Sequence, residues 1–256
     1  MSQSLDVEKL EREVKAVYRD VATEPDGEFH FEMGRPLAER LGYPGDILDR
    51  IPQAALDSFA GVGYHFDLAD MAEGAAVLDL GSGSGTDVFG AAVLVGESGR
   101  VVGLDMTEEQ LEKARTLRDS AGFDTVSFES GYIESLPFDD DSFDIVISNG
   151  VINLSAQKAQ VFEEIARVLR PGGQLALSDI ISEERLSDST KADADLWAAC
   201  IGGAMEVEKY QEIIENAGLE ILEMRENTNY EFTSEQAQSA CQSYGVKSMS
   251  LGAKIR

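Results

Sequence analysis

The spacing of apolar residues divides the chain into three parts, and the first part is expected to be helical. Near its start, apolar side chains recur at steps of three and four residues, and these are Leu5, Val7, Leu10, Val14, Val17 and Val21. This spacing predicts an amphipathic helix that ends at Pro25-Asp-Gly27. Five glycines and three prolines between residues 28 and 73 indicate short helices and loops. We therefore expect residues 1–73 to form an N-terminal helical cap region rather than a separate domain.

The second part, residues 74–182, alternates short apolar runs with segments of helical period. Predicted strands lie at 76–80, 99–105, 125–128, 143–148 and 174–178, and predicted helices lie at 86–95, 107–120 and 155–169. Thr107-Glu-Glu-Gln110 has the form of a capping box, and Pro171-Gly-Gly173 is expected to stop the last helix. Strands that alternate with helices in this way favour a mostly parallel sheet with right-handed crossovers.

The third part, residues 183–256, is expected to add substrate-side helices and C-terminal edge strands to the same domain. Helical spacing recurs at 192–205, 207–217 and 234–243. The apolar stretches 219–232 and 246–255 are typical of strands, and they could pair antiparallel at the edge of the sheet. The chain as a whole is thus predicted to be an α/β protein with a mostly parallel seven-stranded sheet, helices on both faces and an N-terminal helical cap.

The charge of the chain narrows its partners. Acidic residues number 48 against 21 basic ones, a formal net charge of −27, and they are spread along the whole length. Such a chain is repelled by nucleic acids and anionic lipid surfaces, so neither is an expected partner. Acidic residues distributed in this way favour a halophilic protein, because salt screens their mutual repulsion. The absence of a signal-peptide pattern and the presence of only two cysteines, Cys200 and Cys241, predict a cytoplasmic protein.

A glycine loop follows the first strand of the predicted sheet. The loop is Gly81-Ser-Gly-Ser-Gly85, and Asp105 closes the next strand twenty residues later. Glycines at such a turn let the backbone approach a ligand without Cβ clashes. A carboxylate at the position of Asp105 is suited to accept hydrogen bonds from both hydroxyls of an adenosine ribose. Ligands of open α/β sheets bind at this edge, so the loop is the candidate binding site.

The details of the loop distinguish two classes of adenosine ligand. Its glycines are spaced G-x-G-x-G, whereas the dinucleotide pattern is G-x-G-x-x-G. Asp79 stands two residues before the loop, and a carboxylate there favours an ammonium group over a pyrophosphate. The loop also lacks an Arg or Lys to meet phosphate. These features favour S-adenosylmethionine, while NAD binding and a glycine turn without a ligand remain alternatives.

Four segments taken together resemble class I S-adenosylmethionine-dependent methyltransferases, which have a Rossmann-like fold. They are Val77-Leu-Asp-Leu-Gly-Ser-Gly-Ser-Gly85, the strand-ending Asp105, the Leu136-Pro-Phe138 segment and Arg167-Val-Leu-Arg-Pro-Gly-Gly173, and the resemblance covers residues 74–182. It implies that the loop faces the methionine part of S-adenosylmethionine, Asp105 the ribose, and Met106, Ile133 and Glu134 the adenine. Asn149 would border the reacting methyl group as a catalytic residue. The cofactor-binding set implied in this way is Asp79, Gly81, Ser82, Gly83, Gly85, Asp105, Met106, Gln110, Ile133, Glu134 and Asn149.

Further segments are similar to the arsenite methyltransferase family. They are 103–111, Gly131-Tyr-Ile-Glu134, Ile147-Ser-Asn-Gly-Val-Ile-Asn-Leu-Ser155, Ser178-Asp-Ile180 and Trp197-Ala-Ala-Cys-Ile-Gly-Gly-Ala204. This resemblance implies that Cys200 is a catalytic thiolate and a ligand of trivalent arsenic, a thiophilic centre. Gly150 and Val62 stand where the family has its other two ligand cysteines. The acceptor would therefore be arsenite that arrives with small-molecule thiols, or Cys241 would supply a second sulfur.

Three functions remain open at the level of the sequence. The first is methyl transfer from S-adenosylmethionine to a small-molecule acceptor, as in arsenite methyltransferases. The second is methylation of a different small metabolite, for which His30 or His65 could serve as a base. The third is a non-catalytic protein that binds S-adenosylmethionine or a nucleotide. A free cysteine is also commonly a small buried apolar residue, which is the alternative role for both Cys200 and Cys241.

Overall fold

The structure is a computed structural model that describes residues 7–25, 27, 29, 31–191, 196–197 and 200–256. Its centre is one sheet whose strands run in the order β3 (Val126–Ser130), β2 (Arg100–Asp105), β1 (Ala76–Leu80), β4 (Phe143–Asn149), β5 (Leu169–Ser182), β8 (Lys247–Ile255) and β7 (Leu219–Glu226). The first five are parallel, and β8 runs antiparallel between β5 and β7. The predicted seven-stranded, mostly parallel sheet is confirmed, and the two residues of β6 (Met205–Glu206) add an eighth strand beside β5.

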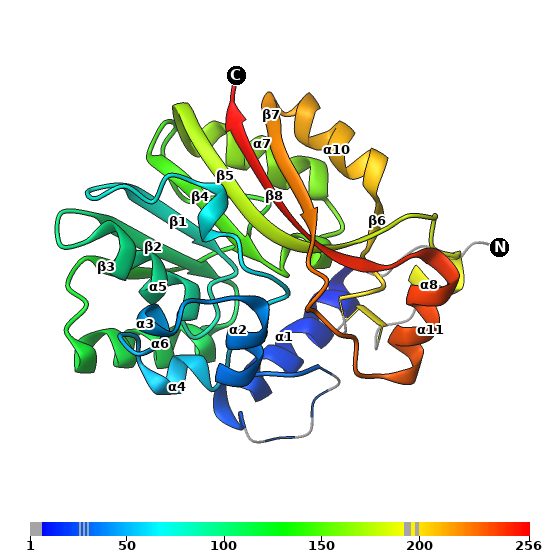
Figure 1. Cartoon of the computed structure of the whole chain (residues 1–256), viewed down its shortest axis with the longest axis horizontal. Coiled ribbons are helices and arrows are strands. Elements are labelled where there is room, and N and C mark those ends of the chain that lie inside the picture. The colour runs from blue at the N-terminus through cyan, green and yellow to red at the C-terminus, as the bar shows by residue number, and fades with distance from the viewer. Residues whose placement is uncertain (1–6, 26, 28, 30, 192–195, 198–199) are drawn as a thin grey trace.

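Helices cover both faces of this sheet (Figure 1). One face carries α5 (Thr86–Val95) and α6 (Glu108–Ala121) together with the short N-terminal helices α2 (Arg35–Leu41), α3 (Gly45–Leu48) and α4 (Gln53–Leu56). The other face carries α7 (Lys158–Val168) and α10 (Val207–Asn216). Successive residues of β1 feed the two cores alternately, with Val77 in the first and Leu78 in the second, because strand side chains point to opposite faces.

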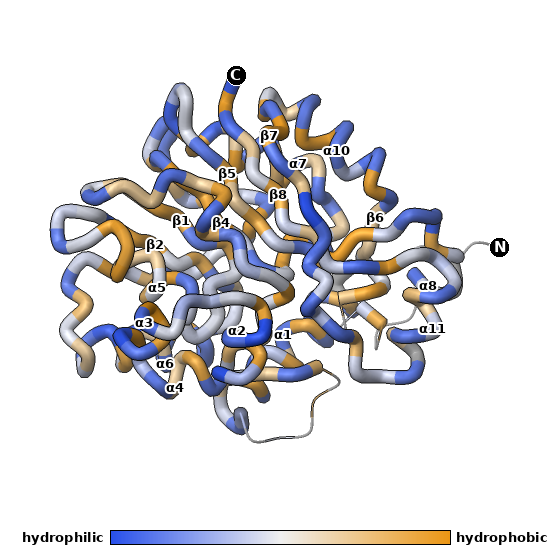
Figure 2. Tube along the Cα trace, in the orientation of Figure 1, coloured by the Kyte–Doolittle hydropathy of each residue, from blue (hydrophilic) through white to orange (hydrophobic). Residues whose placement is uncertain are grey.

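The remaining elements surround the edge of the sheet where the parallel strands end. Helix α1 (Val7–Thr23) packs on α6. The short turn η1 (Phe66–Leu68) lies within the N-terminal cap region, and the short turn η2 (Ile152–Leu154) follows β4. Helices α8 (Asp188–Lys191) and α11 (Glu235–Tyr244) lie at the far end of β5 and β8 (Figure 1). Figure 2 shows apolar and polar residues alternating along the outer helix α10, as its amphipathic sequence predicts. In the part of the chain that is described, no helix is both long and apolar enough to cross a membrane.

Several local predictions are wrong. The capping box is not formed, because Thr107 makes no side-chain cap bond and Gln110 turns its amide away. Pro171-Gly-Gly173 does not stop α7, which ends at Val168; it lies inside β5, which begins at Leu169. The strand predicted at 219–232 is shorter than expected, since β7 ends at Glu226, whereas the strand predicted at 246–255 is confirmed by β8 and pairs antiparallel with β7. Within the predicted helix 192–205, residues 196–197 are helical, residues 200–204 form an irregular turn and Met205 begins β6, while residues 192–195 and 198–199 lie outside the described residues.

Candidate active site

A cavity of about 370 Å³ lies at the carboxyl ends of β1, β2 and β4, with one wall formed by α1. This volume falls in the range of small-molecule and cofactor sites. The structure brings ten of the predicted site residues to its walls: Asp79, Gly81, Ser82, Gly83, Asp105, Met106, Gln110, Ile133, Glu134 and Asn149. Gly85 and Cys200 are not among the wall residues.

The glycine loop is held against β2 by its own backbone. The N–H groups of Gly81 and Ser82 donate to the Leu104 carbonyl at 2.8 and 2.9 Å, and the Gly83 N–H donates to Asp105 Oδ2 at 2.9 Å. Gly81 has a φ of +69°, and a Cβ there would collide with the side chain of Val151. The loop therefore brings backbone to the cavity wall where no larger residue fits.

Gly85 is placed by packing at the start of α5 and does not line the cavity. It lies at the start of α5 with a φ of +96°, and a Cβ there would stand 2.9 Å from the rings of Phe128 and Phe89. Helix α5 can pack closely on the sheet only because this residue has no side chain. Its place in the G-x-G-x-G pattern thus follows from packing, and a role in cofactor binding is not visible in its position.

The end of the cavity near Asp79 is suited to a cation. Asp79 is 2% exposed, and within the described part of the chain neither its Oδ2 nor Ser82 Oγ has a hydrogen-bond partner. Burial, together with the nearby carboxylates of Asp87 and Asp105, raises the pKa of Asp79 well above its ordinary value. An ammonium group would satisfy the free oxygen and relieve this repulsion. The chemistry of these residues therefore fits the amino group of S-adenosylmethionine.

The opposite part of the cavity is suited to an adenosine. Asp105 lines the cavity, and its Oδ1 accepts the Thr107 N–H at 2.8 Å, which fixes the carboxylate at the end of β2. Burial raises the pKa of Asp105, and the backbone donors of Thr107 and Gly83 oppose that rise. The half-buried apolar side chains of Met106 and Ile133 lie on the walls beside it. Glu134 accepts a bond of 2.5 Å from Ser155 Oγ, which fixes its carboxylate at this end.

Gln110 connects three segments of the site. Its Nε2 donates to the Tyr18 carbonyl of α1 at 2.7 Å, and its Oε1 accepts the Ser84 hydroxyl of the glycine loop at 2.5 Å. The residue is 2% exposed, so both bonds are sheltered from water. Gln110 thereby attaches α1 and the glycine loop to α6. The apparent capping box in the sequence predicts a different contact for this side chain.

Asn149 is committed to the protein around it. Its Nδ2 contacts three acceptors, namely Tyr43 Oη and Asp87 Oδ2 at 3.0 Å and the Gly63 carbonyl at 3.1 Å. Its Oδ1 accepts the Val62 N–H at 2.8 Å. The side chain thus holds the 61–63 loop to the end of β4. This geometry is that of a positioning residue at the cavity wall.

Cys200 lies next to this loop, behind the cavity wall. It is 8% exposed and has a φ of +62°, and its Sγ lies 3.6 Å from the Gly150 carbonyl and 4.0 Å from Tyr18 Oη. Val62 is adjacent, since a Cβ on Gly150 would stand 3.2 Å from Val62 Cγ1. The three positions that the sequence singled out for arsenic therefore converge. Burial, with a smaller contribution from Asp179, raises the pKa of the Cys200 thiol to about 11.

A buried polar network supports Cys200, and no pattern in the sequence predicts it. Asn153 Nδ2 donates to the Cys200 carbonyl at 2.9 Å. The Asn153 N–H contacts Asp179 Oδ1 at 3.3 Å, and Tyr210 donates to Asp179 Oδ2 at 2.6 Å. Lys158 Nζ donates to the Asn153 carbonyl at 2.8 Å. Burial lowers the pKa of Lys158 to about 8 and raises that of Asp179 to about 6, so the two interacting groups titrate close to neutral pH.

The strand order of the sheet and the residues of the cavity indicate to which class of protein the chain belongs. Comparison with known proteins identifies that class. A family model described as a methyltransferase domain matches residues 72–218. The chain belongs to this family of methyltransferases. Its strand order, glycine loop and strand-ending Asp105 are those of the class I fold, whose cofactor is S-adenosylmethionine.

Several relatives of this methyltransferase are arsenite methyltransferases. It is 41% identical over 187 residues to that of Halobacterium salinarum, covering 73% of this chain and 48% of the relative. It is 35% identical to that of Mus musculus, covering 80% of this chain and 56% of the relative. A crystal structure of an arsenic(III) S-adenosylmethionine methyltransferase from Chlamydomonas reinhardtii is 32% identical, covering 88% of this chain and 74% of that chain, with a TM-score of 0.65. The chain spans about half the length of these curated relatives.

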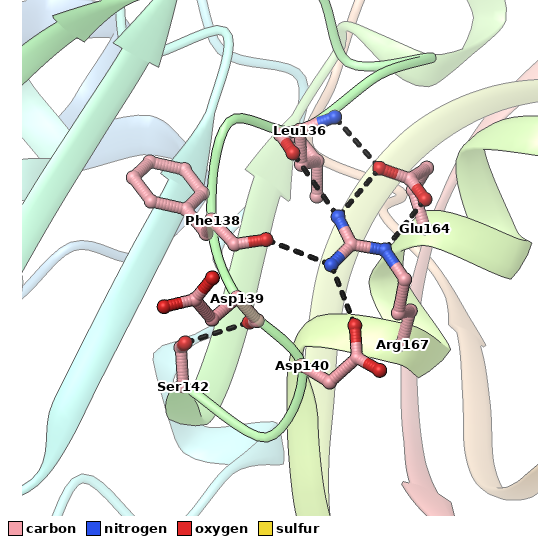
Figure 3. A network of polar contacts seen from close by, with 7 residues as sticks. All are labelled: Leu136, Phe138, Asp139, Asp140, Ser142, Glu164 and Arg167. Atoms are coloured by element: carbon pink, nitrogen blue, oxygen red, sulfur yellow. Dashed lines mark hydrogen bonds and ion pairs between the residues drawn. The ribbon is translucent and has the colours of Figure 1, made fainter.

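Arg167 of the methyltransferase holds the segment that carries Ile133 and Glu134 (Figure 3). Its guanidinium donates to the carbonyls of Leu136 at 3.0 Å and Phe138 at 2.7 Å, and it pairs with Glu164 at 2.7 and 2.8 Å. Glu164 in turn accepts the Leu136 N–H at 2.7 Å. These bonds attach the 131–138 segment to α7. They give Arg167 a structural role within the motif Arg167-Val-Leu-Arg-Pro-Gly-Gly173.

His65 and Cys241 are not among the residues that line the cavity. His65 is fully buried, its ring nitrogens have no partner within the described part of the chain, and burial lowers its pKa. Because His65 does not line the cavity, it is not placed to act as a base on a bound substrate. Cys241 is half-buried on α11 and packs against the same apolar cluster as Cys200. His30 lies outside the described residues.

Proposed function

We propose that this methyltransferase transfers the methyl group of S-adenosylmethionine to trivalent arsenic bound through Cys200. The observation that carries the proposal is the position of the Cys200 thiol. Its Sγ lies 3.6 Å from the carbonyl of Gly150, and Gly150 stands between Asn149 and Val151, which both line the cofactor cavity. The thiol therefore adjoins the Asp79 end of the cavity, where the methionine part of the cofactor would lie. The arsenite methyltransferases among the relatives support the same acceptor.

The residues of the chain bind and orient in this proposal, and they transfer no proton. S-adenosylmethionine supplies an electrophilic methyl group when bound. Asp79 and the glycine loop hold its amino-acid end, Asp105 holds the ribose, and Met106 and Ile133 enclose the adenine. The arsenic lone pair is the nucleophile, so catalysis rests on alignment rather than on a general base. Asn149 acts by holding the 61–63 loop against the cavity.

The proposal also covers the cellular compartment and the salt conditions in which the reaction takes place. The net charge of −27 supports a protein of a salt-rich cytoplasm that uses neither nucleic acid nor a membrane as a partner. A relative from Halobacterium salinarum is consistent with that setting. Small thiols of the cell would keep arsenic trivalent and deliver it to Cys200.

The test is S-adenosylmethionine turnover at high salt with trivalent arsenicals and thiol, followed by mass spectrometry of the product. We expect arsenical-dependent formation of S-adenosylhomocysteine in the native protein and at least a hundredfold loss in Cys200→Ser. Cys241→Ser is the matched control, because it removes the other thiol and should leave turnover unchanged. Undiminished turnover in Cys200→Ser would remove the thiolate role. Turnover that needs no arsenical would point to another small metabolite as the acceptor.

A further inference from the structure

Lys158, the first residue of α7, has an ammonium group that is enclosed by protein. The residue is 6% exposed, and its Nζ donates to the carbonyls of Asn153 at 2.8 Å and Ser155 at 2.7 Å. The Nζ also lies 5.5 Å from the centre of the Trp197 ring. A buried ammonium group is costly unless acceptors surround it, so these contacts indicate a specific role for the charge.

The two carbonyls belong to a segment that forms part of the cavity wall, which we call the wall turn (residues 153–157). Leu154, Ser155, Ala156 and Gln157 line the cavity, and Lys158 is not among its wall residues. One ammonium group thus binds two carbonyls of the turn that joins η2 to α7. Lys158 therefore acts on the cavity from behind its wall.

Ser155 connects the wall turn to the adenosine end of the cavity. Its hydroxyl donates to Glu134 at 2.5 Å and accepts the Gln157 N–H at 3.0 Å. The position of Ser155 therefore sets that of the Glu134 carboxylate. The Asp79 end of the cavity is built from other elements, namely β1 and the glycine loop that follows it.

The opposite side of the wall turn is closely packed. A Cβ on Gly203 would collide with the Asn153 carbonyl and with the Trp197 ring, and a Cβ on Gly202 would collide with the same ring. The backbone at Asn153 therefore lies between the Lys158 ammonium group and the turn at 202–203. Its position is fixed from both sides as long as Lys158 keeps its bonds.

We propose that Lys158 is a positioning residue for cofactor binding. Its ammonium group holds the wall turn, and through Ser155 the Glu134 carboxylate, in the shape that binds adenosine. The inference concerns the cofactor and holds for any methyl acceptor. It makes the affinity for an adenosine ligand depend on the proton of one buried lysine.

The charged groups around Lys158 determine the pH at which it loses this proton. Burial lowers its pKa to about 8, and Lys191 of α8 acts in the same direction. Asp179 of β5 and Glu134 act in the opposite direction. Burial raises the pKa of Asp179 to about 6, so this carboxylate, to which Tyr210 of α10 donates at 2.6 Å, is ionised when Lys158 titrates. Lys158 is therefore charged below about pH 8 and becomes neutral above it.

This titration gives the proposed role a pH signature. A neutral amine makes weaker hydrogen bonds to the Asn153 and Ser155 carbonyls than an ammonium group does. The affinity for an adenosine ligand should therefore be constant up to about pH 8 and fall above it. The sign is opposite to that expected for Asp79, whose ionisation strengthens cofactor binding as the pH rises.

The test uses 5′-methylthioadenosine, which keeps the adenosine of the cofactor but lacks its ammonium group and sulfonium charge. Calorimetric titration at pH steps from about 6.5 to 9.5 measures its affinity, and we expect the native protein to lose about fivefold or more above pH 8. Trp197, the only tryptophan of the chain, reports the same event without ligand, since its fluorescence responds to the charge on Nζ. The midpoints of the two pH profiles should coincide.

Variants of Lys158 separate its role from a general loss of structure. Lys158→Met should bind 5′-methylthioadenosine and S-adenosylmethionine more weakly by the same factor, about tenfold, and the affinity for the former should no longer change with pH. Lys158→Gln, whose N–H donors do not titrate, should show an intermediate affinity and no pH step. Lys209→Met removes an exposed lysine of α10 and is the matched control, with native affinity and pH profile. Asp79→Asn should weaken S-adenosylmethionine alone.

A second route to the same answer does not depend on the folding of Lys158→Met. Ser155→Ala removes the hydroxyl that donates to Glu134 and should weaken 5′-methylthioadenosine severalfold. Native affinity for this ligand in Lys158→Met would overturn the inference. So would a native protein whose affinity stays constant while the Trp197 fluorescence changes with pH, or a Ser155→Ala variant that binds as the native protein does.

Discussion

At the scale of single residues, Asp79 is the proposed partner of the cofactor's ammonium group. Its carboxyl is 2% exposed, and its Oδ2 has no partner within the described part of the chain. Burial and the carboxylates of Asp87 and Asp105 favour its protonated form, so its pKa lies well above the ordinary value. A bound cation favours the ionised form instead. Cofactor binding must therefore release a proton from this carboxyl whenever the free protein holds one.

This linkage predicts how affinity depends on pH. The pKa of Asp79 is raised in the free protein and lowered by the ammonium group, so the affinity for S-adenosylmethionine should rise with pH and level off above the raised pKa. Asp79→Asn should weaken binding about tenfold or more, which is roughly 1.4 kcal/mol, and flatten the dependence. Calorimetric titrations between about pH 5 and pH 8 would measure both effects. Asp124→Asn, an exposed position with the same change of charge, is the control. Equal pH dependence in Asp79→Asn and native protein would contradict this role.

Other residues show why the sequence predicts site membership better than site roles. The positions of Asp79, Asp105 and most of the glycine loop follow from the order of strands, because the carboxyl ends of parallel strands share one edge. Gly85 and Gln110 were assigned to the cofactor by their place in a pattern. The contacts of Gly85 include the Phe128 ring and those of Gln110 the Tyr18 carbonyl, and both partners come from distant parts of the chain.

At the scale of elements, β1, β2 and β4 were predictable because nearly all of their residues are buried, so they stand out as short apolar runs. The short helices α2, α3 and α4 could not be located from the sequence, because short helices show little periodicity in their apolar positions. Pro171-Gly-Gly173 was read as a helix stop, whereas the helix ends earlier and the chain continues directly into β5. The network of Asn153, Lys158 and Asp179 could not be predicted from the sequence, because it joins residues up to 26 positions apart and forms only when their elements pack together.

The attachment of the 131–138 segment to α7 can be tested by mutation of Arg167. Arg167→Ala removes the donors to the Leu136 and Phe138 carbonyls and the ion pair with Glu164 (Figure 3). We expect the free energy of unfolding to fall by about 1–3 kcal/mol. The affinity for S-adenosylmethionine should also fall severalfold, because Ile133 and Glu134 lose their support.

Denaturant unfolding and cofactor titration would measure the two effects, and amide hydrogen exchange would show whether residues 131–138 become less protected. Arg118→Ala is the matched control, because Arg118 pairs with the exposed Asp119 outside the site. Faster exchange that is confined to other segments would contradict the assigned role of Arg167.

At the scale of the molecule, the excess of acidic over basic residues sets the conditions under which the fold is stable. Helix α10 shows the effect locally, because Glu208, Glu212 and Glu215 are exposed and fall on one side of the helix at steps of four and three residues. Like charges at these steps destabilise a helix by a few tenths of a kcal/mol per pair at low salt. Summed over a net charge of −27, such repulsion favours the unfolded chain until salt screens it.

We therefore expect the melting temperature to rise by several degrees between about 0.1 and 1 M potassium chloride, over which the Debye length falls from ~10 to ~3 Å. A triple variant with Glu208→Gln, Glu212→Gln and Glu215→Gln should melt higher than the native protein at low salt and nearly equally at high salt. Replacing the same three residues by Asp keeps the charge and serves as the control, with its lower helix propensity shifting both salt conditions alike. Thermal unfolding followed by circular dichroism at matched salt steps decides the matter. A stabilisation by glutamine that persists undiminished at 1 M salt would show that helix propensity, rather than charge repulsion, causes it.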